Sequence, residues 1–204
     1  MVSPYPVRFD VDFPARPLGR LATAFRIILA LPIIVVLTML TSMMAQNDHN
    51  RGTIALAAGV LFLPLVVMLL FRQKYPRWWF DWNLNLLRFS NRVTAYLALL
   101  DDRYPSTDEE QSVHLEFAYP DAHQLSRWLP LVKWLLAIPH YVALLFLGIA
   151  SIAAIVIAWF AILFTGRYPQ GLFNFVVGVL RWSNRVTAYA FALVTDQYPP
   201  FRLS

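Results

Sequence analysis

Two clusters of arginine and asparagine have the side chains and the spacing to bind an anion. The segment RFSNRVTAY occupies residues 88–96 and RWSNRVTAY occupies residues 181–189, so an Arg-x-x-Asn-Arg motif occurs twice. A guanidinium group can donate two parallel hydrogen bonds to a phosphate or a carboxylate. We therefore predict a site for an anion or a lipid headgroup, with these candidate residues: Arg88, Asn91, Arg92, Arg181, Asn184 and Arg185.

The same arginines also have a purely structural interpretation. They are as well suited to cap helix ends, to bind the Tyr-Pro segments that flank each motif, or to pair with Asp81, Asp101 and Asp196. Both interpretations stay open at the level of sequence, because each uses the same charged groups.

Few other residues have side chains and surroundings that suggest catalysis or ligand binding. His140 lies in an apolar run directly after Pro139, where a histidine serves as a ligand or proton relay, or bonds to the backbone that a proline frees. The acidic residues between 101 and 110 are typical of a solvated linker. The chain has no cysteine and no nucleophile elbow, phosphate-binding loop or HExxH motif. We predict no catalytic residues, metal or cofactor, and hence a protein that is not an enzyme.

The overall composition indicates the class of protein in which these residues lie. Of 204 residues, 58% are hydrophobic and 14% are charged, whereas a soluble domain has about 25% charged residues. The net charge of +5 is carried by basic residues that flank apolar runs, which favours anionic lipid over nucleic acid as the partner. The composition therefore indicates a membrane protein.

An internal repeat organises the chain. The two motif segments share eight of nine residues at an offset of 93, and each is bracketed by Tyr-Pro pairs, at residues 75 and 104 and at residues 168 and 198. Upstream, VRFDVDFP at residues 7–14 resembles VHLEFAYP at residues 113–120, and Leu31-Pro32 corresponds to Ile138-Pro139. We predict a tandem duplication, with a first unit over residues 1–105 and a second over residues 106–204.

Each unit is predicted to contain a transmembrane hairpin. Apolar runs at residues 21–45 and 53–71 flank the polar segment 46–52, and each has about the 20 residues that span a bilayer. In the second unit the repeat favours spans at about 126–147 and 150–165, with a turn near Gly148–Ser151, although a re-entrant hairpin is the alternative. Pro32 and Pro139 are expected to kink the first helix of each hairpin.

A segment of amphipathic helix is predicted after each hairpin, at residues 78–100 and 171–195. Asp81, Asn85, Arg88 and Arg92 recur at spacings of four, three and four, as do Asn174, Gly178, Arg181 and Arg185. Each set therefore shares one helix face, and aromatic and aliphatic residues cover the other faces. Two arginines at mid-helix favour a position in the membrane interface over a third span in each unit.

Short alternating segments, Val7–Phe13 and Val113–Tyr119, have the two-residue period of strands. If the units meet around a pseudo-twofold axis, these segments pair into a small ribbon. The predicted fold class is an all-α integral membrane protein, duplicated, with short β-strands before each hairpin.

The basic residues predict the topology. They gather before the first span and after the second and fourth spans, whereas the hairpin turns carry almost none. The positive-inside rule then places both termini in the cytoplasm.

The second unit resembles a known family. The segments LVKWLLAIPHYVALLFL, AWFAILFTGRYPQGLFNFVVGVLRWSNRVTAY and TDQYPPF are similar to the bacterial membrane family DUF4389. The first unit resembles it more weakly, since FRQKYPRWW stands where the family has FTGRYPxGLF. The resemblance implies a bacterial plasma-membrane location and a tandem fold, but no reaction.

These observations lead to one expected function and one alternative. We expect a non-enzymatic scaffold or accessory subunit that associates with membrane lipids and with other membrane protein subunits, and not with nucleic acid. The alternative is a lipid- or anion-binding protein, or a small transporter, that uses the duplicated arginine clusters.

Overall fold

The computed structural model describes residues 5–14, 17–42, 65–107 and 109–204. The elements are β1 (Val7–Val11), α1 (Arg20–Ala24), α2 (Arg26–Ser42), α4 (Arg77–Leu97), β2 (Val113–Phe117), α5 (Leu129–Leu136), α6 (Ile138–Thr165) and α7 (Gln170–Ala190). Residues 65–72 are also helical. The predicted turn at residues 46–52 and the start of the span 53–71 lie outside the described residues.

The predicted pairing of the two alternating segments is confirmed. β1 and β2 form an antiparallel ribbon in which Phe9 is the register partner of Leu115. In both strands the first, third and fifth residues are buried and the other two are exposed. This ribbon joins segments that are more than 100 residues apart in the sequence.

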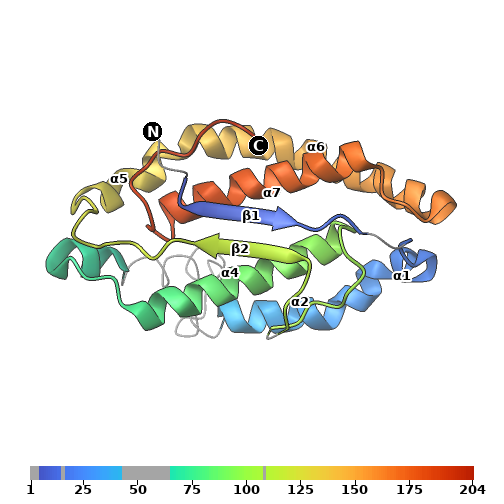
Figure 1. Ribbon diagram of the computed structural model, residues 1–204, viewed down its shortest axis with the longest axis horizontal. Coiled ribbons are helices and arrows are strands. Elements are labelled where there is room, and N and C mark those ends of the chain that lie inside the picture. Colours follow the sequence, from blue (N-terminus) through green and yellow to red (C-terminus); the bar gives the residue numbers. More distant parts are fainter. Residues whose placement is uncertain (1–4, 15–16, 43–64, 108) are drawn as a thin grey trace, which may run out of the picture.

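The long elements run roughly along the long axis of the molecule (Figure 1). The ribbon packs on α4 and α7, because β1 contacts α7 and β2 contacts α4. α4 contacts α2 and α7 contacts α6, and α2 and α6 lie at opposite edges of the view in Figure 1. The core lies between the ribbon and the helix pair, with Phe9, Leu115, Leu84 and Val177 in one buried cluster.

Both predicted amphipathic helices are present and begin directly after a Tyr-Pro pair. Pro76 and Pro169 occupy the positions before α4 and α7 in extended conformation, as expected because proline fixes φ without needing a backbone donor. Each helix ends earlier than predicted. The chain turns at Leu99 and at Leu193, whose φ angles are 63° and 52°, in the left-handed region that ends a helix.

The predicted turn near Gly148–Ser151 is wrong: residues 126–165 contain two helices, α5 and α6, but they divide at another place. α6 is one helix of 28 residues that continues through Gly148 and Ser151 without a turn. After Pro139 no proline or polar run interrupts it, so a continuous helix satisfies more backbone groups than a turn in apolar surroundings. The break occurs instead at Ala137, where Pro139 falls in the first turn of α6. Pro32, by contrast, lies inside α2.

One candidate membrane span is found in the described residues. It covers Leu129–Thr165, which joins α5 and α6, and only 17% of its most apolar window is buried inside the protein. The buried positions form a single stripe along α6, with Ser151, Ala154, Ala158 and Ile162 at helical spacing. A core helix of a soluble protein is mostly buried, so this exposure favours contact with lipid. Whether this or any other segment crosses the membrane stays a prediction.

Candidate functional site

The two asparagines of the motifs are brought together at the centre of the molecule. Asn91 of α4 and Asn184 of α7 are buried, and each donates from Nδ2 to the other's Oδ1 over 2.9 and 2.8 Å. Each Nδ2 also donates to a carbonyl one turn earlier, that of Leu87 or Leu180. The pair therefore satisfies its own polar groups and links the two long helices.

The first arginine of each motif binds the ribbon. Arg88 donates from Nε to the carbonyl of Leu115, and Arg181 donates from Nε to the carbonyl of Phe9, both over 2.9 Å. Because Phe9 and Leu115 are register partners, the two arginines hold opposite strands at the same level. Arg181 also forms an ion pair with the exposed carboxylate of Asp10, at 3.0 Å.

The last arginine of each motif binds a segment that follows its own helix. Arg92 donates to the carbonyl of Ser106 over 2.7 Å, and Arg185 donates to the carbonyls of Arg202 and Ser204 over 3.2 and 2.7 Å. Burial, together with the positive charges of Arg202 and Arg181, lowers the pKa of Arg185.

The four arginines do not converge on one point. Arg181 and Arg185 line a cavity of about 400 Å³ beside β1, together with Arg8, Asp10, His114 and Glu116. Arg88 and Arg92 are not part of its lining. The two asparagines thus contact each other, whereas the four arginines bind different segments of the chain. Anion binding by these residues stays a prediction.

Two buried cations form a second matched pair that sequence reasoning did not identify. Arg26 donates to the carbonyl of Asp101 and forms an ion pair with Asp102. Lys133 donates to the carbonyl of Thr195 over 2.7 Å and forms an ion pair with Asp196 at 2.6 Å. Both cation side chains are buried.

The surroundings of these cations also match. Arg26 lies over the ring of Tyr96 and Lys133 over the ring of Tyr189. The other carboxylate oxygen of each aspartate accepts a backbone N–H, from Gly19 or from Ser126, over 2.6 and 2.7 Å. The cations are 107 residues apart, as Pro32 and Pro139 are, and the aspartates are 94 apart, as Tyr104 and Tyr198 are. Extending the repeat alignment through both offsets would have found them.

His140 has a hydrogen-bond partner that the sequence did not predict. Its Nδ1 accepts from Nε1 of Trp182 over 3.1 Å, and its ring stacks on Phe201 with centroids 4.0 Å apart. At the corresponding positions of the first unit, Ile33 and Phe89 share one apolar cluster. The second unit thus has a hydrogen-bonded pair where the first has an apolar contact.

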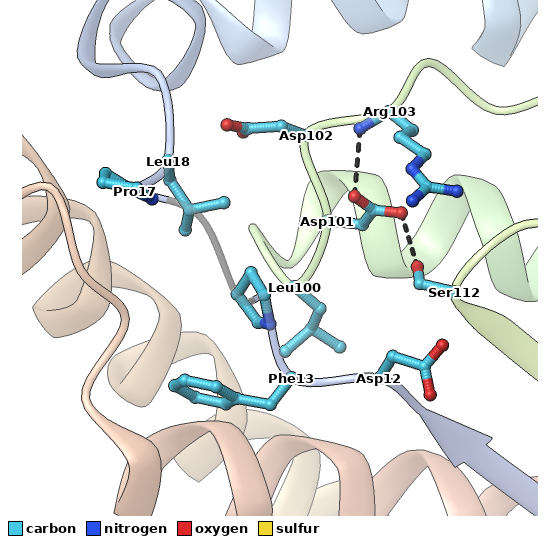
Figure 2. Close-up of a pocket in the computed structure, with 10 residues that line it drawn as sticks. Asp12, Phe13, Pro17, Leu18, Leu100, Asp101, Asp102, Arg103 and Ser112 are labelled. Carbon is cyan, nitrogen blue, oxygen red and sulfur yellow. Dashed lines mark hydrogen bonds between the residues drawn. The ribbon is translucent and has the colours of Figure 1, made fainter.

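A cavity of about 500 Å³ lies between the end of β1 and the turn after α4 (Figure 2). Asp12, Asp101 and Asp102 line it, and each of these carboxylates already has a partner. That of Asp12 is Nε2 of His114, at 3.1 Å. Asp101 accepts from the backbone of Arg103 and from Ser112, while Asp102 binds Arg26 and Gly19. In the described ranges no group of three or more His, Cys, Asp or Glu residues is arranged to hold a metal.

Comparison with known families gives one match. Residues 127–202 match the family described as "Domain of unknown function (DUF4389)", and this range holds α5, α6 and α7. A tandem copy of the family in the first unit stays a prediction. Neither the curated proteins nor the solved structures contain a match to the chain. Residues 127–202 are therefore similar to DUF4389, which confirms the resemblance predicted from the sequence of the second unit.

Proposed function

We propose that this protein is a non-enzymatic membrane protein that serves as a scaffold or accessory subunit of a larger complex in the bacterial plasma membrane. The observation that carries the proposal is the apolar surface of Leu129–Thr165, of which only 17% of the most apolar window is buried. Such a surface is stable against lipid or against apolar helices of another subunit. We place both termini on the cytoplasmic side, because basic residues flank the apolar segments.

We also propose that the chain is an internal duplication whose halves are related by a pseudo-twofold axis. The matched contacts support it: the reciprocal Asn91–Asn184 pair, the two arginine–strand bonds, and the two buried cation–aspartate pairs. The strand of each unit packs on the long helix of the other, so neither unit is complete alone. Because each strand packs on the long helix of the other unit, each of these helices carries its own copy of the motif that binds a strand.

A structural role for the motifs supports a scaffold more than a transport path. In the described part of the chain, the hydrogen bonds of the motif arginines go mainly to backbone carbonyl oxygens. Such bonds fix the strands and the segments after each helix in place. The outer apolar surface is then the part of the molecule that is free to contact partners.

Photo-crosslinking in the native membrane tests the scaffold proposal. A photoreactive residue is placed at Ile149 or Phe160, which are exposed on α6, and at the buried Ala158 as a matched control. We expect a discrete protein adduct from an exposed position, identified by mass spectrometry, and none from Ala158. Adducts with lipid alone at both exposed positions would exclude a partner subunit on this face.

The alternative function, binding of an anionic headgroup, has one observation in its favour. Arg185 is buried, lines the cavity of about 400 Å³, and forms no ion pair with a carboxylate among the described residues. Native mass spectrometry of Arg185→Ala, with Arg92→Ala as the matched control, tests it. Loss of bound phospholipid only in Arg185→Ala supports the alternative, and equal retention in both variants excludes it.

A further inference from the structure

We propose that the molecule lies flat in the membrane, with α5 and α6 along the membrane plane and the β1–β2 ribbon facing water. This inference rests on the proposed membrane location and specifies which surface contacts lipid. The occupant of the exposed apolar surfaces of α2, α5 and α6 is the hydrocarbon and headgroup region of a single membrane surface.

The ribbon carries exposed charged side chains, whereas the exposed side chains of α2, α5 and α6 are mostly apolar. The ribbon packs on α4 and α7, and α4 contacts α2 while α7 contacts α6. Figure 1 shows the strands and the helices α4, α6 and α7 all running along the long axis. Whatever tilt α6 has relative to the membrane is therefore shared by the ribbon.

The outer face of the ribbon is charged. Its exposed side chains are Arg8 and Asp10 on β1 and His114 and Glu116 on β2, and the register pairs Arg8 with Glu116 and Asp10 with His114. The ribbon lies near the middle of the long axis (Figure 1). If α6 crossed the bilayer, these four side chains would lie at the depth of the hydrocarbon core, where charged groups are costly. With the long axis in the membrane plane they face water.

The length of the helix leads to the same orientation. α6 contains 28 residues, about 42 Å of helix at ~1.5 Å per residue, whereas the hydrocarbon core is ~30 Å thick. A crossing helix would leave many apolar residues outside the core, and a helix in the membrane plane leaves none outside.

Each end of the molecule carries an exposed apolar side chain beside two cations. At one end Leu21 is 77% exposed and follows Arg20 in the chain; at the other, Trp128 is 71% exposed and follows Arg127. Arg127 donates to Gln73, the residue before Lys74, and Arg20 lies beside Gly166, the residue before Arg167. Gln73 and Gly166 both have left-handed backbone, with φ of 42° and 74°.

The two end clusters occupy equivalent positions in the two units. Their basic residues distinguish a flat orientation of the molecule from one in which α6 crosses the membrane. A crossing orientation would place one basic cluster on each side of the membrane, against the one-sided preference of Lys and Arg. A flat orientation places both clusters at the same depth, among anionic headgroups. Exposed Trp128, with its amphipathic ring, suits that depth.

Cysteine labelling tests which side each end occupies. The chain has no cysteine of its own, so His123→Cys before α5 and Gln170→Cys after α6 each introduce one thiol at an exposed position. Both variants are treated with a membrane-impermeant maleimide in sealed inverted vesicles and in spheroplasts. The flat orientation predicts that both thiols react from the cytoplasmic side. Labelling from opposite sides overturns the proposal.

Depth measurement along α6 provides an independent test. Spin labels at Val142, Ile149 and Val156 lie seven residues apart and so on the same helix face, and all three positions are exposed. The protein is placed in vesicles that contain an anionic phospholipid. The collision rates of each spin label with oxygen and with a water-soluble nickel complex are measured, and their ratio gives the depth of the label in the membrane. The flat orientation predicts equal depth at the three sites. A depth that changes steadily by about 10 Å between successive labels, as expected at ~1.5 Å per residue, overturns it.

The same labels separate failure of this inference from failure of the membrane proposal. A protein that is washed from the membrane fraction, with all three α6 labels accessible to the nickel complex, contradicts the membrane location itself. A protein that stays in the membrane with unequal depths contradicts only the flat orientation. A label at the exposed Asp10 is the matched control, and it is accessible to the nickel complex if the ribbon faces water.

Discussion

Asn91 and Asn184, which are 93 residues apart, form a closed amide pair in which each side chain both donates to and accepts from the other. The pair lies between α4 and α7, and the register pair Phe9–Leu115 receives one arginine from each of these helices. The contact between the proposed halves is therefore held by a few polar residues of one repeated motif.

Breaking the amide pair on one side should destabilise the protein more than removing it completely. Asn184→Leu leaves the buried Oδ1 of Asn91 without its donor, which typically costs about 1–3 kcal/mol. The double variant Asn91→Leu with Asn184→Leu leaves no such orphan and should recover part of the loss. Unfolding in detergent micelles, arranged as a double-mutant cycle, measures the coupling. Strictly additive effects of the two substitutions would contradict the pairing.

The buried ion pair of the second unit should tolerate exchange for that of the first. Lys133→Met leaves Asp196 without its cation and the carbonyl of Thr195 without its donor, a loss of about 3–5 kcal/mol for a buried pair. Lys133→Arg should retain most of the stability, because Arg26 makes the same two contacts in the first unit. The free energy of unfolding of each variant checks this.

The exposed ion pair between Arg181 and Asp10 is the control for that experiment. The Asp10 side chain is 71% exposed, so Asp10→Asn should change the free energy of unfolding by no more than about 1 kcal/mol. If Lys133→Met costs no more than Asp10→Asn, the buried pair does not have the structural importance assigned to it.

Several features of this structure could be predicted from the sequence because their signals are local or repeated. The strand alternation at residues 7 and 113, the helix starts after Pro76 and Pro169, and the shared face of the motif arginines each depend on a short pattern. The continuity of α6 through Gly148 could not be predicted, because a duplicated pattern favoured a turn that no local residue required. The pairing of Arg26 with Asp102 depends on two different repeat offsets, so a single alignment of the units did not bring them together.

The histidine–tryptophan contact should be convertible into its apolar counterpart. His140→Ile alone leaves the buried Nε1 of Trp182 without an acceptor and should cost about 1–3 kcal/mol. Adding Trp182→Phe recreates the Ile33–Phe89 combination of the first unit and should recover part of that loss. Thermal unfolding of the two variants measures the difference. A double variant that is less stable than His140→Ile would show that packing on Phe201 outweighs the hydrogen bond.

Gly178 should be a position where a helix-favouring substitution harms the protein. Alanine normally stabilises a helix interior relative to glycine by about 0.5–1 kcal/mol. At Gly178, however, an added Cβ would lie 2.9 Å from Cβ of Leu203 and 3.1 Å from its carbonyl oxygen. Leu203 would have to move, and its carbonyl bond to Arg181 would weaken with it. Gly178→Ala should therefore speed hydrogen exchange in residues 200–204.

Gly171→Ala is the matched control in the same helix, because nothing lies within 4 Å of the added Cβ at that position. This variant should keep the exchange of residues 200–204 unchanged and should raise the free energy of unfolding slightly, since only the backbone preference of alanine acts there. Equal protection of residues 200–204 in the two alanine variants would show that this segment does not pack on α7. Faster exchange in Gly178→Ala alone, accompanied by a weakened Arg181 contact, would establish that the motif arginine holds this segment against the helix.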